Sequence, residues 1–183
     1  MPTCLLWTIG HSTRPIENFL ALLQAYGIRQ LVDVRTIPRS RHNPQFNTEA
    51  LRQSLKQAGL GYGHARELGG LRKPLKDSPN LGWKNAGFRG YADYMQTPAF
   101  WNAVDDLMAT AAETPTVIMC AEAVPWRCHR SMIADALLTR GWMARHIMTQ
   151  DRADEHQLTP FAKVEGPRLF YPAPTDEDAP WLF

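Results

Sequence analysis

The stretch "TVIMCAEAVPWRCHRSMIADALLTRGWMARHIM", residues 116–148, carries the pattern that decides the fold class. It opens with "TVIMC" (116–120), an unbroken apolar run typical of a strand that is buried on both faces. "CHRSMIADALLTRG" (128–141) then repeats apolar residues at helical spacing and ends on a glycine. "WMARHIM" (142–148) predicts a second strand. A strand, a helix and a strand in this order form a crossover unit, so the two strands are expected to run parallel.

The same alternation continues through the rest of the chain. Further strands are expected at residues 4–9, 30–34 and 62–68, and further helices at 14–27, 47–59 and 98–111. Residues 71–90 contain prolines and glycines that break any period, and we expect a long loop there. The complete order predicts a three-layer α/β fold: an open, mostly parallel sheet of about five strands in a Rossmann-like or flavodoxin-like arrangement, with helices on both faces.

The length of 183 residues suits one domain with a sizeable core. We expect a single α/β domain over residues 1–165 and a proline-rich tail without regular structure over 166–183. The last three residues, Trp181, Leu182 and Phe183, either dock on the body or on the partner subunit of a homodimer, or stay loosely held.

Composition excludes several classes of protein. The formal net charge of +2 is too small for general attraction to nucleic acid, so any such binding has to come from local clusters. No apolar stretch approaches the roughly 20 residues that a membrane span needs, and the N-terminal residues do not resemble a secretory signal. Three cysteines, an odd number, favour reduced thiols and a cytoplasmic location.

Polar and reactive residues follow each of the first four predicted strands. They are Gly10, His11 and Ser12 after the first strand, Asp33, Arg35, Arg39 and Ser40 around the end of the second, Glu67, Gly69 and Gly70 after the third, and Cys120, Glu122 and Arg127 to Arg130 after the fourth. In an open parallel sheet, ligands bind beyond the carboxyl ends of the strands. We therefore expect these residues to converge at one edge of the sheet.

The segment "PWRCHR" combines two properties that suit a reactive site. A helix that begins near Trp126 leaves the backbone amides of its first turn unpaired. Those amides belong to Arg127, Cys128 and His129. Such a turn attracts an anion, with added attraction from Arg130, and it lowers the pKa of a thiol at Cys128.

Each of these residues also has a purely structural interpretation. Cys120 is expected to be a small buried apolar group, whereas Cys128 stays open between packing and chemistry. Arg130 has the alternative role of pairing with Glu122 or Asp33 at the sheet edge, because a buried charge needs a partner.

Metal binding by Cys120, Cys128 and His129 is a further alternative, but the two cysteines lack the short paired spacing of zinc sites. The arginine spacing after either cysteine does not fit a phosphatase or sulfurtransferase loop. After the first strand, "GHSTRP" has a single glycine, so no phosphate-binding glycine run is present there. We therefore predict neither a metal site nor a cofactor.

Two predicted loops interleave basic and aromatic residues, at 35–46 and at 66–91. Such loops can follow a nucleic-acid backbone and stack its bases, or cover a flat anion such as a nucleotide. The alternative is a pair of solvated loops whose aromatic side chains belong to the core.

Five motifs occur in a fixed order over roughly residues 5 to 148: "TIGHS", "LVDVRTIPRS", "ELGGLR", "FRGYADYM" and "CAEAVPWRCHRSMIA". With these motifs the sequence resembles the domain-of-unknown-function family numbered 488, a group of bacterial and archaeal proteins. The resemblance implies an α/β fold and no particular reaction. It maps the family's recurrent positions onto Gly10, His11, Ser12, Asp33, Arg35, Pro38, Ser40, Leu68, Gly69, Gly70, Tyr91, Cys120, Glu122, Cys128, His129 and Arg130.

The functional hypothesis is an enzyme that acts on an anionic, phosphate-bearing substrate: a nucleotide, a nucleic acid or a sugar phosphate. The catalytic candidates are Asp33 or Glu122 as general acid or base, Cys128 as nucleophile or bystander, and His11 or His129 as proton shuttle. The candidates for substrate binding are Arg35, Arg127 and Arg130 for the anion, together with Gly10, Ser12, Ser40, Gly69, Gly70 and Tyr91. The alternatives are a non-catalytic module that binds nucleic acid or nucleotide, and a metal-binding protein that uses cysteine and histidine.

Overall fold

A computed structural model describes residues 4–175 of the chain, and the expectation for Trp181, Leu182 and Phe183 lies outside the described residues. The strands of the main sheet are β1 (Leu5–Gly10), β2 (Gln30–Asp33), β3 (Gly61–His64), β4 (Thr116–Cys120), β5 (Met143–Ile147) and β6 (Ala153–Glu155). The helices are α1 (Ile16–Ala25), α2 (Thr48–Gln57), α3 (Ala86–Tyr94), α4 (Pro98–Glu113) and α5 (Arg130–Thr139).

The main sheet has six strands in the order β3-β2-β4-β1-β5-β6. The first five strands run parallel, and β6 pairs antiparallel with β5. The open, mostly parallel sheet of an α/β fold is therefore confirmed. Its strand order is neither the 3-2-1-4-5-6 order of dinucleotide-binding domains nor the 2-1-3-4-5 order of flavodoxin.

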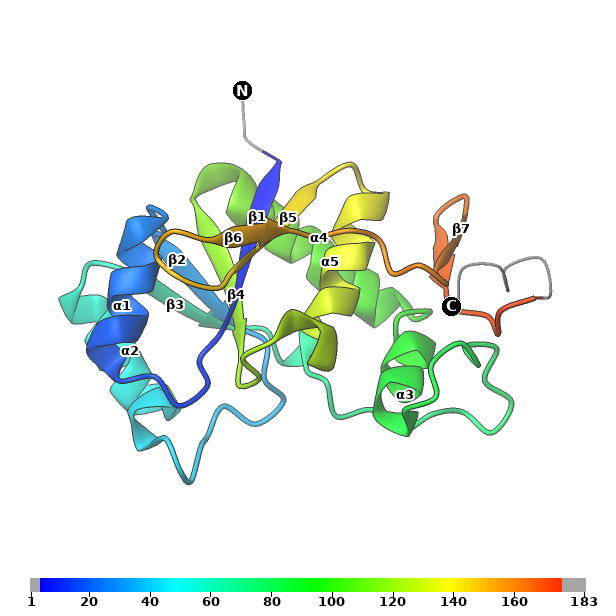
Figure 1. Cartoon of the computed structure of the whole chain (residues 1–183), viewed down its shortest axis with the longest axis horizontal. Helices are drawn as coiled ribbons and strands as arrows, with labels where there is room; N and C mark the ends of the chain where they lie inside the picture. The colour runs from blue at the N-terminus through cyan, green and yellow to red at the C-terminus, as the bar shows by residue number, and fades with distance from the viewer. Residues whose placement is uncertain (1–3, 176–183) are drawn as a thin grey trace.

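Helices cover both faces of this sheet, which confirms the three layers (Figure 1). On one face α1 and α2 pack against Val117 and Met119 of β4. On the other face α4 and α5 pack against Ile118 and Cys120 of the same strand. Since successive side chains of a strand point to opposite faces, the unbroken apolar run of β4 serves both cores.

The register of the parallel strands brings their carboxyl ends to one level. Gly10 at the end of β1 pairs with Cys120 at the end of β4, and Asp33 at the end of β2 pairs with Met119. The chain then leaves β1 toward α1 on one face and β4 toward α5 on the other face (Figure 1). Two adjacent strands whose connections leave to opposite faces define a switch point, where open α/β sheets bind ligands.

β6 is an antiparallel strand beyond the five predicted ones, and three other parts of the chain also differ from the expectations. α3 begins in the last part of the predicted loop at 71–90 and continues to Tyr94, and the Asn85 side chain accepts hydrogen bonds from two amides of its first turn. The strand expected over 62–68 ends at His64, because a tight turn, Arg66–Leu68, follows it. The tail expected to lack regular structure contains β8 (Arg168–Phe170), which forms a hairpin with β7 (Lys163–Glu165).

Candidate functional site

A pocket of about 380 Å³ opens at the carboxyl end of β4. It is lined by the loops that follow β2, β3 and β4 and by the start of α3, four segments that are far apart in the sequence. Its volume falls within the range of small-molecule sites. None of the described helices is long and apolar enough to cross a membrane.

Cys120 and Cys128 meet in the wall of this pocket. Cys120 is the last residue of β4, and Cys128 lies shortly before α5. The loop between them folds back, so that Cys128 lies beside Cys120. Their Sγ atoms are 2.6 Å apart, and both residues are free cysteines. The expectation that Cys120 packs as an apolar group describes its burial, with 2% of its surface exposed, but it misses the contact with the second thiol.

His129 presents a ring nitrogen to the same thiol. Its Nε2 lies 2.9 Å from the carbonyl oxygen of Val34, and Nδ1 lies 3.5 Å from Cys128 Sγ. A carbonyl only accepts hydrogen bonds, so Nε2 carries the proton. In the neutral ring Nδ1 therefore has a lone pair directed at Cys128, and it can take the proton of that thiol.

The environment favours a thiolate on Cys128 and a thiol on Cys120. Burial acts to raise the pKa of Cys128, but its side-chain hydrogen bonds with Cys120 and His129, the positive charge that His129 gains when it takes the thiol proton, and the charge of Arg130 outweigh this effect, so the pKa lies well below the ordinary value. Burial, with the hydrogen bond and charge of Cys128, raises the pKa of Cys120 well above the ordinary value.

The start of α5 lies further along the chain than the sequence indicates. α5 begins at Arg130, and the amides of Arg127 and Cys128 donate to the carbonyls of Val124 and Pro125 in a tight turn. The prediction that the amides of Arg127 and Cys128 are unpaired is therefore wrong. The low pKa of Cys128 comes from its side-chain neighbours instead.

Arg130 is buried beside the pocket and holds the loop that forms it. Its Nη2 donates to the backbone carbonyls of Glu122 and Ala123, both at 3.0 Å, and Nη1 lies 3.4 Å from Thr8 Oγ1. It contacts the backbone of Glu122 rather than its carboxylate, so the expected ion pair with Glu122 or Asp33 does not form. The charge of Arg130 still favours the nearby thiolate.

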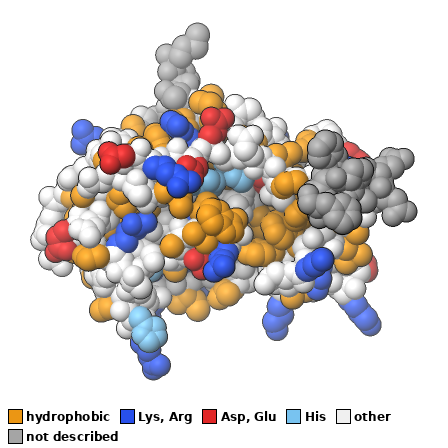
Figure 2. All heavy atoms as spheres, viewed as in Figure 1, with side chains coloured by type: hydrophobic (Ala, Val, Ile, Leu, Met, Phe, Trp, Pro, Cys, Tyr) orange, Lys and Arg blue, Asp and Glu red, His pale blue; other side chains and the backbone are white. Residues whose placement is uncertain are grey.

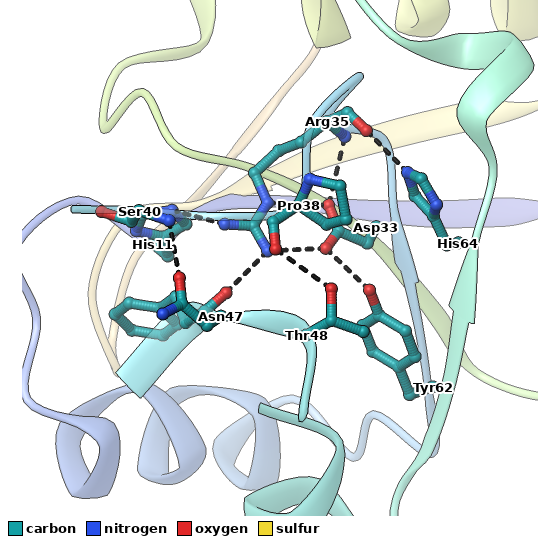
Figure 3. Close-up of polar contacts among 10 residues, drawn as sticks. His11, Asp33, Arg35, Pro38, Ser40, Asn47, Thr48, Tyr62 and His64 are labelled. Carbon is teal, nitrogen blue, oxygen red and sulfur yellow. Dashed lines mark hydrogen bonds and ion pairs between the residues drawn. The ribbon is translucent and has the colours of Figure 1, made fainter. Parts of the chain in front are cut away.

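Asp33 and Arg35 form a buried ion pair at the end of β2 (Figure 3). Arg35 donates from Nε and Nη2 to the two oxygens of Asp33 at 2.9 and 2.7 Å, and the hydroxyl of Tyr62 donates to Asp33 at 3.0 Å. Arg35 also donates to the carbonyl of Phe46 at 2.8 Å, while His64 Nε2 contacts the carbonyl of Arg35 at 2.7 Å. This network fixes the loop after β2, which forms one wall of the pocket.

His11 belongs to the same network. Its Nδ1 lies 2.8 Å from the carbonyl of Ser12, so Nδ1 carries the proton and Nε2 accepts from Arg35 Nη1 at 3.3 Å. Burial first, and then the charge of Arg35, lower the pKa of His11 despite its backbone hydrogen bond. The backbone amides of His11 and Ser12 donate to the carbonyls of Cys120 and Ala121, which joins β1 to the loop after β4.

Several of the predicted binding residues support the pocket from behind. A Cβ atom at Gly10 would collide with the carbonyl of Glu122, and one at Gly69 would collide with Thr36. The Tyr91 hydroxyl donates to the carbonyl of Leu68, and its ring meets the ring of His129 edge to face. Ser40, outside the pocket lining, accepts from the amide of Asn43.

The exposed residues of the lining are the ones that can meet a ligand. Arg39, Glu122 and Arg127 line the pocket with exposed side chains. Within residues 4–175 neither arginine forms an ion pair or a hydrogen bond through its guanidinium group. Asn85 and Phe88 at the start of α3 also line it, and sequence reasoning missed them. The asparagine that precedes "AGFRGYADY" is the helix-capping signal that points to them.

The described part of the chain contains no group of three or more His, Cys, Asp and Glu side chains that could hold a metal ion. The sulfurs of Cys120 and Cys128 and the imidazole of His129 lie together, and Nε2 of that imidazole is engaged with the carbonyl of Val34. This cluster combines two thiols with a base.

Fold and geometry define the class: a three-layer α/β protein with a cysteine–histidine pair beside the switch point of its sheet. The model of the domain of unknown function DUF488 matches residues 15–137, more than half of the chain, so the protein belongs to that family. No curated protein and no solved structure matches the chain.

Proposed function

We propose that the protein is an enzyme that acts on an anionic, phosphate-bearing substrate, with Cys128 as its nucleophile and His129 as the base that activates it. One observation carries the proposal. Cys128 Sγ lies 3.5 Å from His129 Nδ1 in the wall of a pocket of about 380 Å³. A nucleophile within reach of a base, with a third group that orients the base, is the arrangement of covalent catalysis. The carbonyl of Val34 is that third group.

The charge around the pocket supports an anionic substrate. Arg39 and Arg127 line the pocket with exposed side chains, whereas the guanidinium of Arg35 is already paired with Asp33. Guanidinium groups bind phosphate and carboxylate oxygens in pairs of hydrogen bonds. The volume accommodates a nucleotide, a sugar phosphate or one end of a nucleic acid.

The reaction begins when the Cys128 thiol gives its proton to His129. The thiolate then attacks an electrophilic atom of the substrate: a bond from that atom to sulfur forms, and the bond to the leaving group breaks. The imidazolium of His129 protonates the leaving group, and the exposed Glu122 carboxylate lies at the pocket as a base for the incoming water. Water then attacks the covalent adduct, which releases the product and restores the thiol.

Asp33 has a supporting role in this proposal, in place of proton transfer. Both of its carboxylate oxygens accept hydrogen bonds from Arg35, and one also accepts from Tyr62, in a fully buried position. His11 is likewise held between Ser12 and Arg35. Both residues shape the loops around the pocket and do not belong to its lining.

The alternative of a nucleic-acid-binding module has less support from the loop at 66–91. Trp83 packs against Phe161 at 4.8 Å and against Phe88 at 5.0 Å between ring centroids. Arg72 lies over the ring of Tyr94 at 3.6 Å. These side chains are engaged within the protein, so they do not form an exposed row on which bases could stack.

Two alkylating probes of the same chemistry test the nucleophile and the anion site together. Neutral iodoacetamide is expected to react with Cys128 at pH 6.5 at least about tenfold faster than with an ordinary thiol, because only the thiolate reacts. Anionic iodoacetate is expected to gain further from the arginines. Arg127→Gln should slow iodoacetate about three- to tenfold and leave iodoacetamide unchanged. Peptide mass spectrometry identifies the alkylated residue.

The control for the charge change is Arg29→Gln. Arg29 is exposed just before β2, at the amino-terminal ends of the parallel strands and therefore away from the pocket. Turnover is tested with a panel of nucleotides and sugar phosphates and detection of products by mass spectrometry. Cys128→Ser should abolish turnover, and Glu122→Gln should reduce it while the substrate still binds. A Cys128 thiol that alkylates only above pH 8, or turnover that survives Cys128→Ser, contradicts the proposal.

A further inference from the structure

We propose that Cys120 and Cys128 work as a dithiol that reduces hydroperoxides and forms a reversible disulfide in the wall of the pocket. This inference rests on the nucleophilic Cys128 of the proposed function, but it needs neither the anion site nor Glu122. Cys120, which the proposed function leaves without a task, becomes the residue that resolves the oxidised nucleophile.

The geometry provides the pair. The two sulfurs are in contact at 2.6 Å, so a disulfide between them requires little movement of either side chain. The loop that joins them is held at both ends: Arg130 binds the carbonyls of Glu122 and Ala123, and the carbonyl of Cys120 accepts from the amide of His11. The third cysteine, Cys4, is exposed before β1 at the opposite edge of the sheet and cannot compete within the same chain.

The two thiols have distinct roles. Cys128 is the one that ionises, because its sulfur lies 3.5 Å from Nδ1 of the base His129. Cys120 keeps its proton and stays behind as a thiol. Both residues are largely buried but line the pocket, so hydrogen peroxide can approach them through it. Low-pKa, accessible cysteines next to a second cysteine are typical of peroxide-reactive sites.

The chemistry balances without a further cofactor. Cys128 gives its proton to His129, and the thiolate attacks one oxygen of the hydroperoxide. A sulfur–oxygen bond forms, the oxygen–oxygen bond breaks, and the departing alkoxide or hydroxide takes the proton from His129. Cys120 then attacks the sulfenic sulfur, and the hydroxyl leaves as water with the Cys120 proton. Two thiols and one hydroperoxide thus give one disulfide, one alcohol or water, and one water. An external dithiol reduces the disulfide and restores the site.

The test uses the full chain, reduced and then treated with one equivalent of hydrogen peroxide at pH 7. Free thiols, counted after denaturation, should fall from three to one, and the mass should fall by two hydrogens. Peptide mapping should place the bond between Cys120 and Cys128. With excess dithiothreitol the chain should consume peroxide through repeated cycles, faster than the thiol reductant alone.

Three variants assign the roles. Cys120→Ser should stop at a sulfenic acid on Cys128, which dimedone traps, and lose the repeated cycles. Cys128→Ser should abolish the reaction at this site, and the matched control Cys4→Ser should behave as the wild type. If iodoacetamide reacts rapidly with Cys128 but peroxide gives no Cys120–Cys128 bond, the dithiol inference is overturned and the proposed function stands. If Cys128 reacts slowly with both reagents, both proposals are overturned.

Discussion

At the scale of single residues, the orientation of one imidazole ring decides what Cys128 can do. His129 is held from three sides. Val34 accepts its Nε2 proton, the ring of Tyr91 meets it edge to face at 5.2 Å between centroids, and Gly70 lies against its Nδ1 edge. These contacts direct the free lone pair to the thiol. Gly70 is required because a side chain there would occupy the space of the ring.

Gly70→Ala is therefore expected to displace the imidazole from Cys128. A Cβ atom at Gly70 would lie 2.7 Å from His129 Nδ1 and 2.9 Å from Cγ, closer than real contacts allow. We expect the pKa of Cys128 to rise, so that its alkylation at pH 6.5 slows at least about tenfold, and the free energy of unfolding to fall by about 1–3 kcal/mol. The control is Gly63→Ala, whose Cβ meets only Gln30 at an ordinary 3.6 Å. Equal alkylation rates for the two variants would refute the role of the ring.

At the scale of elements, the connection from β4 to α5 is held from within. Arg130 lies in the first turn of α5, is 1% exposed, and reaches back to the carbonyls of Glu122 and Ala123. A buried guanidinium that binds backbone carbonyls stabilises an irregular loop in the way that strand pairing stabilises a strand. This places Cys120 and Cys128 next to each other although the loop itself has no regular structure.

Replacing Arg130 tests this element. Arg130→Met fills similar space but leaves the two carbonyls without their donor and removes a charge that favours the thiolate. We expect the free energy of unfolding to fall by about 2–3 kcal/mol, and the pKa of Cys128 to rise. Urea denaturation and the pH profile of alkylation measure the two effects. Arg140→Met, at the exposed end of α5 where Arg140 lies over Trp101, should leave the thiol pKa unchanged. An unchanged pKa in Arg130→Met would contradict the role of its charge.

At the scale of the whole molecule, a buried chain of hydrogen bonds joins β1, β5, α5 and the segment after β6. Thr8 Oγ1 lies 2.6 Å from His146 Nδ1, His146 Nε2 lies 3.0 Å from His156 Nδ1, and His156 Nε2 lies 2.7 Å from Asp135. The Tyr171 hydroxyl, next to β8, donates to the same carboxylate. This chain borders a second pocket of about 460 Å³, and Figure 2 shows histidine side chains among hydrophobic ones near the middle of this face.

His146, in the middle of this hydrogen-bonded series, should make the stability of the folded protein depend on pH. Burial first, and then the positive charges of His156 and Arg130, lower the pKa of His146 to about 3. The unfolded chain binds a proton at His146 below its ordinary pKa of about 6.5, whereas the folded chain does not. The free energy of unfolding should therefore fall as pH falls from about 6.5 toward 3, by up to about 1.4 kcal/mol per pH unit from this residue. The lowered pKa of His11 acts in the same direction.

Urea denaturation between pH 7.5 and 5 measures this dependence. His146→Gln removes the titrating group, so the variant should be less stable than the wild type at pH 7.5 but lose less stability on acidification. The matched control, His42→Gln, changes an exposed histidine and should keep the wild-type slope. Identical slopes for wild type and His146→Gln would show that another group controls the acid sensitivity.

Much of the fold could be predicted from local patterns. β1, β2 and β4 contain short apolar runs, and α1, α2, α4 and α5 carry apolar residues at helical spacing. Such a pattern places the apolar side chains on the buried face of a strand or helix. It can be read from neighbouring residues alone, so it is visible in the sequence. α3 was missed because it contains two glycines, and β6, β7 and β8 were missed because three residues are too few to show a period. Their structure depends on contacts such as that of the amide of Tyr171 with Asn80.

The candidate site divides in the same way. The sequence by itself determined which residues follow the strands and therefore stand at the carboxyl edge of the sheet, because parallel crossovers leave no other edge for them. Only the tertiary structure decided how they face one another. In the folded protein Asp33 and Arg35 form a buried ion pair, and Arg130 binds backbone carbonyls. The sulfur of Cys120 lies in contact with that of Cys128. Hydrogen bonds between distant segments set these orientations, and no period in the sequence records them.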